Sequence, residues 1–304
     1  MAESGTESGT SCGFVAVLGA PNAGKSTLIN RMVGAKVSIV TPKVQTTRIR
    51  VLGITIHGTS QLVFIDTPGI FKPRRRLDRA MVAAAWKGAA DADRILLLVD
   101  VKRGIDDDTA RIVDGLEKSQ RKAILGLNKV DLIPRERLLE FSAELNARGI
   151  FTDTFMISAL TGDGVDDLMD FLGHAVPAGP WLYPEDQLSD LPQRLMAAEI
   201  TRERLFVETR QEVPYSTTVE TEDWQERDDG SVRIEQTVYV QRATQKGIVL
   251  GKGGQMIKSI GAAARAELEE MYGRKVHLFL HVKVRPKWME DRSRYTPWGL
   301  DYNA

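Results

Sequence analysis

The stretch GAPNAGKST at residues 19–27 constrains the fold of this chain more than any other. It follows the apolar run FVAVLG and places Gly19, Gly24, Lys25 and Ser26 at the spacing of a phosphate-binding loop. In such a loop, backbone N–H groups approach phosphate oxygens closely and the lysine supplies positive charge. At average residue frequencies, a chance match has a probability of about one in a hundred in a chain of this length. The pattern therefore predicts a strand, a phosphate-binding loop and a helix, in that order.

The segment DTPG supplies a second nucleotide-binding element. Asp66 follows the apolar run LVFI, so it lies at the end of a predicted strand, where its carboxylate can hold Mg²⁺ through water. The backbone N–H of Gly69 can sense a γ-phosphate. Between this segment and the phosphate loop lies KVQTTRIR, whose threonines can complete the Mg²⁺ shell; Thr47 is favoured over Thr46. The alternative is that both threonines simply lead into the next strand.

The segment NKVD favours guanine over adenine. Asp131 offers a carboxylate that accepts hydrogen bonds from N1–H and the 2-amino group of guanine, and adenine lacks this pair of donors. A carboxylate left unpaired would reject the wrong base by several kcal/mol. Ser158 and Ala159 follow the next predicted strand, where a backbone N–H can bond guanine O6.

These motifs give a complete set of predicted site residues. Four are expected to act in catalysis: Lys25, Asn22, Thr47 and Gly69. Three are expected to hold the metal: Ser26, Thr47 and Asp66. The nucleotide is expected to contact Gly19, Ala20, Pro21, Asn22, Ala23, Gly24, Lys25, Ser26, Thr27, Asp66, Thr67, Pro68, Gly69, Ile70, Asn128, Lys129, Asp131, Ser158, Ala159 and Leu160.

A second glycine-lysine loop, GKGG at residues 251–254, points to a nucleic acid. The whole chain is neutral, with 41 basic and 41 acidic residues, but residues 242–287 contain ten basic and three acidic residues, a net charge of +7. This is the local charge expected for a phosphate-backbone partner. No Ser or Thr follows Lys252, and a helix pattern rather than a strand precedes the loop, which argues against a second nucleotide site.

The G-x-x-G pattern between two predicted helices matches the loop of a KH domain, which clamps single-stranded RNA. The alternative is a glycine turn that merely joins the helices. RNA is expected to contact Gly251, Lys252, Gly253, Gly254, Ile257 and Lys258, over an apolar floor of Ile248, Ile257 and Ile260. No DNA partner is expected.

Short apolar runs alternate with helical patterns from residue 14 to residue 175, which predicts an α/β domain with a mostly parallel sheet and flanking helices. The element order then changes to helix, strand, strand, helix, helix, strand, which predicts a smaller α+β domain of type II KH topology. The predicted division is a disordered tail at 1–12, a GTPase domain at 13–176, a linker at 177–187, a KH domain at 188–288 and a C-terminal tail at 289–304.

GAPNAGKST, QTTR, DTPG, NKVD and SAL together resemble the five motifs of a family of GTPases, and with the KH pattern the chain resembles the Era family of bacterial ribosome-assembly GTPases over residues 13–288. The resemblance implies GTP hydrolysis with Mg²⁺, binding of GTP and GDP, binding to 16S rRNA near its 3′ end, and assistance to 30S subunit maturation. It also implies a cytoplasmic protein with some peripheral association with the inner face of the membrane.

Ile70 departs from many signalling GTPases, which carry a water-orienting glutamine at this position. An isoleucine cannot orient water by hydrogen bonding. Relatives with this departure and an asparagine at the position of Asn22 are in several cases activated by K⁺, so the resemblance implies K⁺ as a further cofactor.

Three competing functions remain open on the residues alone. A metabolic kinase would use the same phosphate loop, but NKVD argues against it. An RNA-binding module could keep a nucleotide site that scarcely hydrolyses, because Ile70 replaces the glutamine. An RNA-modifying GTPase would need a catalytic cysteine in the second domain, whereas the single cysteine is Cys12. One cysteine also excludes a disulfide within the chain and fits a reducing cytosol.

Overall fold

The structure, a computed structural model, describes residues 9–304. The chain divides into two compact units. The first unit contains the described residues up to Ser38, Thr47–Asp190 and Tyr295–Ala304, and the second contains Ile39–Thr46 and Leu191–Arg294. The predicted tail lies largely outside the described residues. The prediction of disorder is wrong for Ser11 and Cys12, because both residues belong to the first strand and the Cys12 N–H donates to Pro177 O at 3.0 Å.

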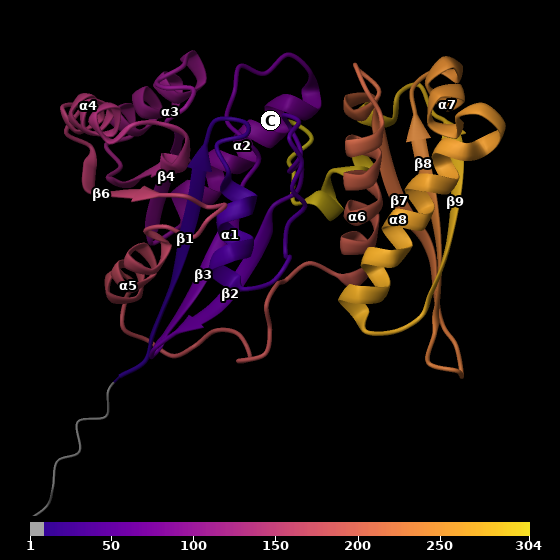
Figure 1. The fold of residues 1–304 in the computed structure, drawn as a ribbon, viewed down its shortest axis with the longest axis horizontal. Helices are drawn as coiled ribbons and strands as arrows, with labels where there is room; N and C mark the ends of the chain where they lie inside the picture. Colours follow the sequence, from indigo (N-terminus) through magenta and orange to yellow (C-terminus); the bar gives the residue numbers. More distant parts are fainter. Residues whose placement is uncertain (1–8) are drawn as a thin grey trace, which may run out of the picture. The chain divides into compact units, whose positions relative to one another are not determined.

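The first unit is built on a six-stranded sheet in the order β2-β3-β1-β4-β5-β6 (Figure 1). The strands are β1 (Ser11–Gly19), β2 (Val51–His57), β3 (Ser60–Asp66), β4 (Arg94–Asp100), β5 (Ala123–Asn128) and β6 (Phe151–Ile157). Among the strand pairs of residues 9–304 in this sheet, only β2–β3 is antiparallel, so the predicted mostly parallel sheet is confirmed. The carboxyl ends of the parallel strands meet at one edge, which is where ligands bind in such sheets.

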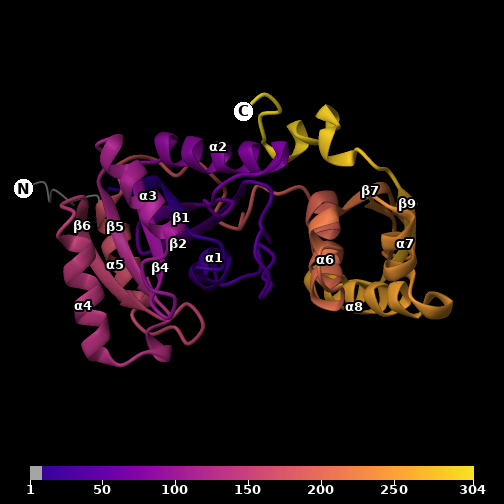
Figure 2. The ribbon, with the colours of Figure 1, turned by 90° about the horizontal axis from the view of Figure 1, so that it is seen from above.

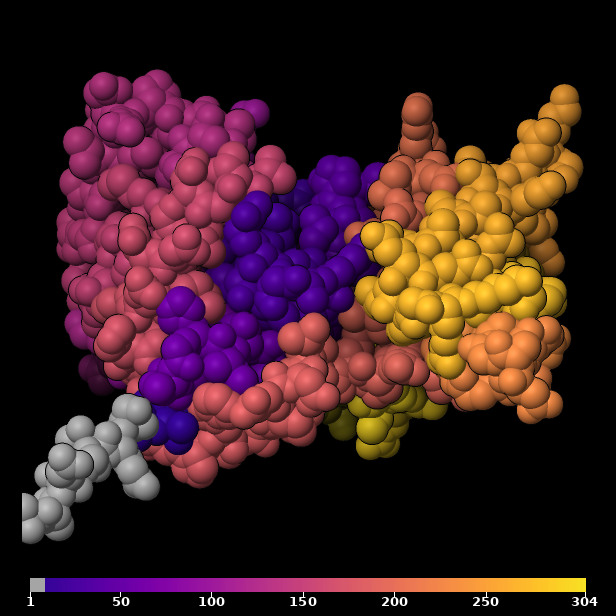
Figure 3. All heavy atoms as spheres, turned by 60° about the horizontal axis from the view of Figure 1, so that its bottom comes forward, coloured from indigo at the N-terminus to yellow at the C-terminus, as the bar shows by residue number. Residues whose placement is uncertain are grey.

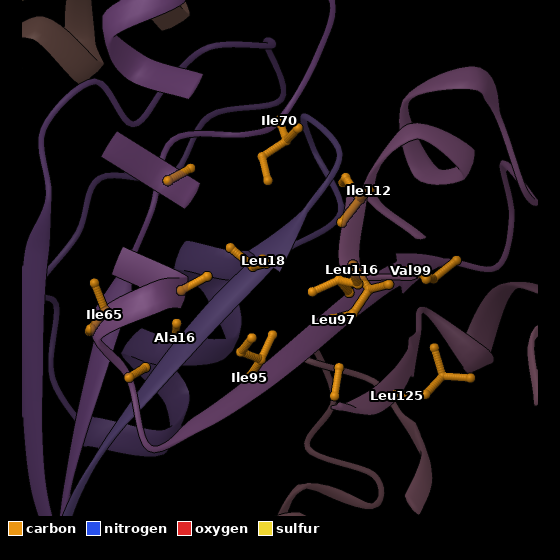
Figure 4. Packing of buried hydrophobic residues seen from close by; sticks show 14 of the residues in the cluster. Ala16, Leu18, Ile65, Ile70, Ile95, Leu97, Val99, Ile112, Leu116 and Leu125 are labelled. Carbon is orange, nitrogen blue, oxygen red and sulfur yellow. The ribbon is translucent and has the colours of Figure 1, made fainter. Parts of the chain in front are cut away.

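Helices cover both faces of this sheet (Figure 2). One face carries α1 (Lys25–Val33) and α5 (Val165–Ala175), and the other carries α2 (Arg76–Asp91), α3 (Asp107–Lys118) and α4 (Arg135–Asn146). Successive residues of β1 therefore belong to different apolar cores. Ala16 and Leu18 pack with Ile95 and Leu97 on the side of α2 and α3 (Figure 4), whereas Val15 and Val17 pack on the side of α1 and α5. Burial on both faces explains why these strands are almost continuously apolar.

The predicted linker, residues 177–187, is packed on the first unit, and residues 188–190, the predicted start of the KH domain, belong to the first unit as well. Ser189 forms an antiparallel bridge with Gly53, and the Ile54 N–H donates to Leu188 O at 2.9 Å. The side-chain oxygen of Gln61 accepts from the N–H groups of Leu182 and Tyr183 at 2.8 and 3.0 Å. Residues 177–190 therefore run along β2 and β3 of the first unit, visible as a salmon band in Figure 3.

The second unit is a three-stranded sheet with helices packed on it. The strands are β7 (Thr217–Glu226), β8 (Val232–Val240) and β9 (Val276–Val284), in the order β7-β8-β9, with β7 antiparallel and β9 parallel to β8. The helices are α6 (Gln193–Glu208), α7 (Ala243–Leu250) and α8 (Gln255–Tyr272). The even-numbered residues of β8 are fully buried, and all of them except Gln236 belong to two apolar clusters. The predicted element order is confirmed.

Two chain segments belong to a different unit from the one expected from their position in the sequence. Ile39–Thr46 belongs to the second unit, where the Val40 N–H donates to the Glu203 carboxylate at 2.8 Å. Tyr295–Ala304 belongs to the first unit, where Tyr295 is 1% exposed and Arg76 donates to Tyr302 O at 3.1 Å. The predicted C-terminal tail is thus packed into the structure.

Candidate functional site

The phosphate loop follows β1 and runs directly into α1. Gly24 precedes the helix with φ of 100°, and a β-carbon there would lie 2.3 Å from Asn128 Nδ2, so the position requires glycine. Because α1 starts at Lys25, its unpaired N–H groups and positive dipole end lie at the loop. This arrangement forms an anion-binding site.

The ammonium group of Lys25 lies where it can bind an anion. Its side chain is buried, and its ammonium group donates to Gly19 O and Ala20 O at 3.1 Å each. Burial lowers the pKa of Lys25 to about 8, and the negative charge of Asp66 acts in the opposite direction. Phosphate oxygens at this position would offset the desolvation of the ammonium group.

Three oxygen-bearing side chains converge beside the loop. Ser26 Oγ lies 2.7 Å from Asp66 Oδ2 and 2.9 Å from Thr47 Oγ1. Asp66 is fully buried, burial raises the pKa of its carboxyl, and its Oδ1 atom has no hydrogen-bond partner among residues 9–304. A buried oxygen without a partner, next to two hydroxyls, fits a hard cation such as Mg²⁺, which takes oxygen ligands and few carboxylates.

The structure also separates the two threonines. Thr47 contacts Ser26, whereas the Thr46 hydroxyl bonds Thr41 Oγ1 at 2.6 Å and donates to Lys43 O at 2.8 Å. The geometry therefore brings Thr47, the residue favoured from the sequence, to the predicted metal ligands.

The motifs predicted to bind the base contact the phosphate loop through Asn128. Its Nδ2 donates to Ala23 O at 2.7 Å, and its Oδ1 accepts from the Ala159 N–H at 2.9 Å. The Ala159 N–H, one of the donors predicted for guanine O6, is thus bonded to Asn128 in this structure. Asp131 and Leu160 are exposed beside this junction, and Leu160 has 73% of its surface accessible.

The segment after Asp66 is held tightly. The Thr67 hydroxyl donates to Val17 O at 2.8 Å, so this side chain anchors the segment to β1. Gly69 lies against Pro21, and a β-carbon at Gly69 would be 3.0 Å from Pro21 Cα. Ile70 is fully buried in the apolar cluster of Figure 4, which excludes it from any contact with water.

Sequence reasoning missed one contact beside the predicted guanine-binding segment. Arg31, on α1, donates from Nε to Ala159 O at 2.7 Å and from Nη2 to Leu160 O. These bonds join residues far apart in the sequence, and Arg31 lies outside every motif. No spacing signal could have revealed it; only the folded sheet brings α1 beside the loop after β6.

The G-x-x-G loop lies between α7 and α8, as predicted. Gly251, Gly253 and Gly254 all have φ between 60° and 78°, and a β-carbon at Gly251 would lie 2.6 Å from Met256 Cβ. At Gly253, a β-carbon would have no atom of residues 9–304 within 4 Å, so this face of the loop is open. Lys252 and Lys258 are exposed, and the loop can therefore offer backbone N–H groups and two cations to phosphates.

The apolar surface beside the loop differs in part from the prediction. Ile248 is 46% exposed and Ile257 is half-buried, so both can contact a ligand. Ile260 is fully buried in the core of the second unit, so its prediction as a floor residue is wrong. Ile260 packs in the apolar cluster that includes Val238 and Val240 of β8 and Val282 of β9. Val284, at the end of β9, is instead 41% exposed.

A phosphate loop, side chains suited to a hard cation and the predicted guanine-binding segments lie at one sheet edge, and a G-x-x-G loop lies between two helices of the second unit. Together these are the features of a GTPase with a KH domain. Family models agree: residues 14–129 match the model described as 50S ribosome-binding GTPase, and residues 212–289 match the KH domain. The chain is 60% identical to GTPase Era of Rhizobium meliloti, over 96% of this chain and 94% of the relative. It belongs to the Era GTPase family, which makes it a GTPase and excludes the kinase alternative.

Other relatives and solved structures agree with this assignment. GTPase Era of Dinoroseobacter shibae is 58% identical over 96% of each chain. The crystal structure of Aquifex aeolicus Era bound to GDP and aluminium fluoride is 39% identical, with a TM-score of 0.90 over 95% of this chain and 99% of that one. A crystal structure of Era with MgGDPNP and nucleotides 1506–1542 of 16S ribosomal RNA gives a TM-score of 0.91 at 39% identity and the same coverage.

Proposed function

We propose that this GTPase binds single-stranded 16S rRNA near its 3′ end through the G-x-x-G loop and assists assembly of the 30S ribosomal subunit. The observation that carries the proposal is the loop Gly251–Gly254, in which Lys252 and Gly253 are exposed beside the exposed Ile248, in the same chain as the guanine-nucleotide site. The Era complex solved with nucleotides 1506–1542 of 16S rRNA supports this choice of RNA.

In this proposal the residues at the sheet edge share the work of hydrolysis. Lys25 and the N–H groups at the start of α1 bind the phosphates and stabilise the charge that develops during transfer. Ser26, Thr47 and Asp66 hold Mg²⁺, which supplies further charge neutralisation when bound. Gly69 and the Thr47 segment contact the γ-phosphate, and Asp131 reads guanine.

Potassium is proposed as an additional activator, bound with the help of Asn22. The complete burial of Ile70 supports this, because the side chain after DTPG offers no polar group to the reaction. Replacing K⁺ by Na⁺ at constant ionic strength is expected to lower the rate of phosphate release at saturating GTP. An unchanged rate in Na⁺ would remove K⁺ from the proposal.

Nucleotide state is expected to alter RNA affinity. A fluorescent RNA of the 16S 3′-terminal sequence would be titrated with the full chain bound to GDPNP or to GDP. A coupling free energy of about 1–3 kcal/mol corresponds to about a 5- to 150-fold difference in dissociation constant. Equal affinities in the two states would contradict a switch, and no binding in either state would contradict the choice of RNA.

Cytoplasmic location and peripheral membrane association are part of the same proposal and rest on family resemblance. Within residues 9–304, no helix has the length and apolar character needed to cross a bilayer.

A further inference from the structure

Three successive carbonyl groups of the phosphate loop are each held by a long side chain. Arg103 Nη1 donates to Pro21 O at 2.9 Å, Lys129 Nζ donates to Asn22 O at 2.9 Å, and Asn128 Nδ2 donates to Ala23 O at 2.7 Å. In a trans peptide the N–H of the next residue points opposite to the carbonyl. A donor on the Pro21 carbonyl therefore directs the Asn22 N–H away from that donor, and the donor on the Ala23 carbonyl does the same for the Gly24 N–H. The Ala23 N–H between them donates to Ala20 O at 3.2 Å.

Two of these donors belong to the NKVD motif, but Arg103 does not belong to any motif. It lies in the connection between β4 and α3, and its Nη2 is 2.5 Å from Asp106 Oδ2. The other oxygen of Asp106 accepts from the Thr109 N–H at 2.8 Å and so caps α3. The guanidinium group is therefore fixed to the start of a helix before it contacts the loop, which reduces the entropy lost in holding Pro21 O.

The backbone takes an uncommon conformation directly after the peptide between Pro21 and Asn22. Asn22 has φ of 65°, in the left-handed region that asparagine enters more readily than most residues other than glycine. The hydrogen bond from Arg103 to Pro21 O stabilises the orientation of this peptide.

We propose that Arg103 is a positioning residue of the phosphate loop, which holds the Pro21 carbonyl so that the Asn22 N–H faces the β-phosphate of the bound guanine nucleotide. The inference rests on the proposed role of this loop in binding the nucleotide. It assigns to the β4–α3 connection a part in GTP binding that none of the five motifs covers. Arg103 acts through the backbone and does not itself touch the nucleotide.

The test compares Arg103→Ala and Arg103→Lys in the full chain with Arg148→Ala as the matched control. Arg148 also fixes α3 by ion pairs, 2.7 Å from Asp114 Oδ1 and 2.5 Å from Glu117 Oε1, but far along the helix from Asp106. Affinities for GMP, GDP and GTP would be measured by competition against fluorescent GDP, and folding by thermal unfolding.

Arg103→Ala is expected to weaken GDP and GTP binding about tenfold, the effect of losing one charge-assisted hydrogen bond, and to leave GMP affinity unchanged. Arg103→Lys keeps one cationic donor and should recover part of the loss, and Arg148→Ala should match the wild type. Unchanged GDP affinity, equal loss for all three nucleotides, or the same loss in Arg148→Ala would overturn the proposal. If Arg103→Ala does not fold, the GDP-to-GMP affinity ratio of Arg103→Lys decides: a ratio equal to that of the wild type overturns it.

Lys25→Ala separates this inference from the function on which it rests. It should lose GDP and GTP affinity far more than Arg103→Ala. If Lys25→Ala keeps wild-type affinity for both, the loop does not bind the phosphates and the proposed site is wrong; if only Arg103→Ala keeps it, the positioning role alone is wrong.

Discussion

Replacing Lys252 and Gly253 together by aspartate is expected to weaken binding of the 16S 3′-terminal RNA by at least about a hundredfold, because a phosphate contact is lost and two like charges face the backbone. Gly253 also has φ of 60°, which an aspartate adopts only with strain. Fluorescence anisotropy at one fixed salt concentration would measure the loss. GTP affinity should remain that of the wild type, since these residues lie in the second unit.

The other end of α8 offers a matched control. Gly273 and Lys275 follow this helix and both are exposed; Gly273 has φ of 61°, and a β-carbon there would have no atom of residues 9–304 within 4 Å. Gly273→Asp combined with Lys275→Asp makes the same change of charge and backbone strain in the same unit. It should reduce RNA affinity by less than about threefold through general electrostatics. An equal loss in both double variants would assign the effect to net charge rather than to the loop.

Replacing Asp131 by asparagine is expected to lower GTP affinity by at least about a hundredfold and to raise affinity for XTP, which carries an oxygen in place of the 2-amino group. The aspartate carboxylate accepts from N1–H and the 2-amino group of guanine. An asparagine amide presents one acceptor and one donor, which match N1–H and the 2-oxygen of xanthine. Competition of GTP and XTP against a fluorescent guanine nucleotide would report both changes.

Asp91→Asn, at the exposed end of α2, makes the same chemical change away from the site and should bind GTP like the wild type. The informative quantity is the ratio of GTP to XTP affinity, because misfolding lowers both. A loss of both nucleotides without inversion of this ratio would mean that Asp131 does not read the base.

The nucleotide site was largely predictable because its motifs are local. Gly24 and Lys25 fall at a strand-to-helix junction that the sequence marks with apolar runs, and Asp66 and Asn128 end strands of the same sheet. In a parallel sheet such strand ends meet at one edge, so adjacency in space follows from topology. Thr46 and Thr47 are adjacent in the sequence, which only favoured Thr47, and the contact of Thr47 with Ser26 distinguishes the two.

What the sequence did not reveal depends on contacts between distant segments. Arg31 and Arg103 hold loop carbonyls 128 and 82 residues away, and arginine on a helix or in a turn gives no signal of such a partner. Ile260 shares its loop-flanking position with Ile257, but helical rotation directs one into the core and leaves the other half-buried. Ser11 and Cys12 resemble the polar tail in composition, yet they belong to β1 because they pair with β3 on one side and with residues 177 and 178 on the other.

The placement of Tyr295–Ala304 in the first unit has a consequence for biosynthesis. A domain at the start of a chain ordinarily folds while the rest is still being translated. Here the phosphate loop, the sheet and α2 emerge early, but the burial of Tyr295 and the Arg76–Tyr302 contact form only when residues 295–304 have left the ribosome. The GTPase unit of this protein is therefore completed only after its RNA-binding domain has been synthesised.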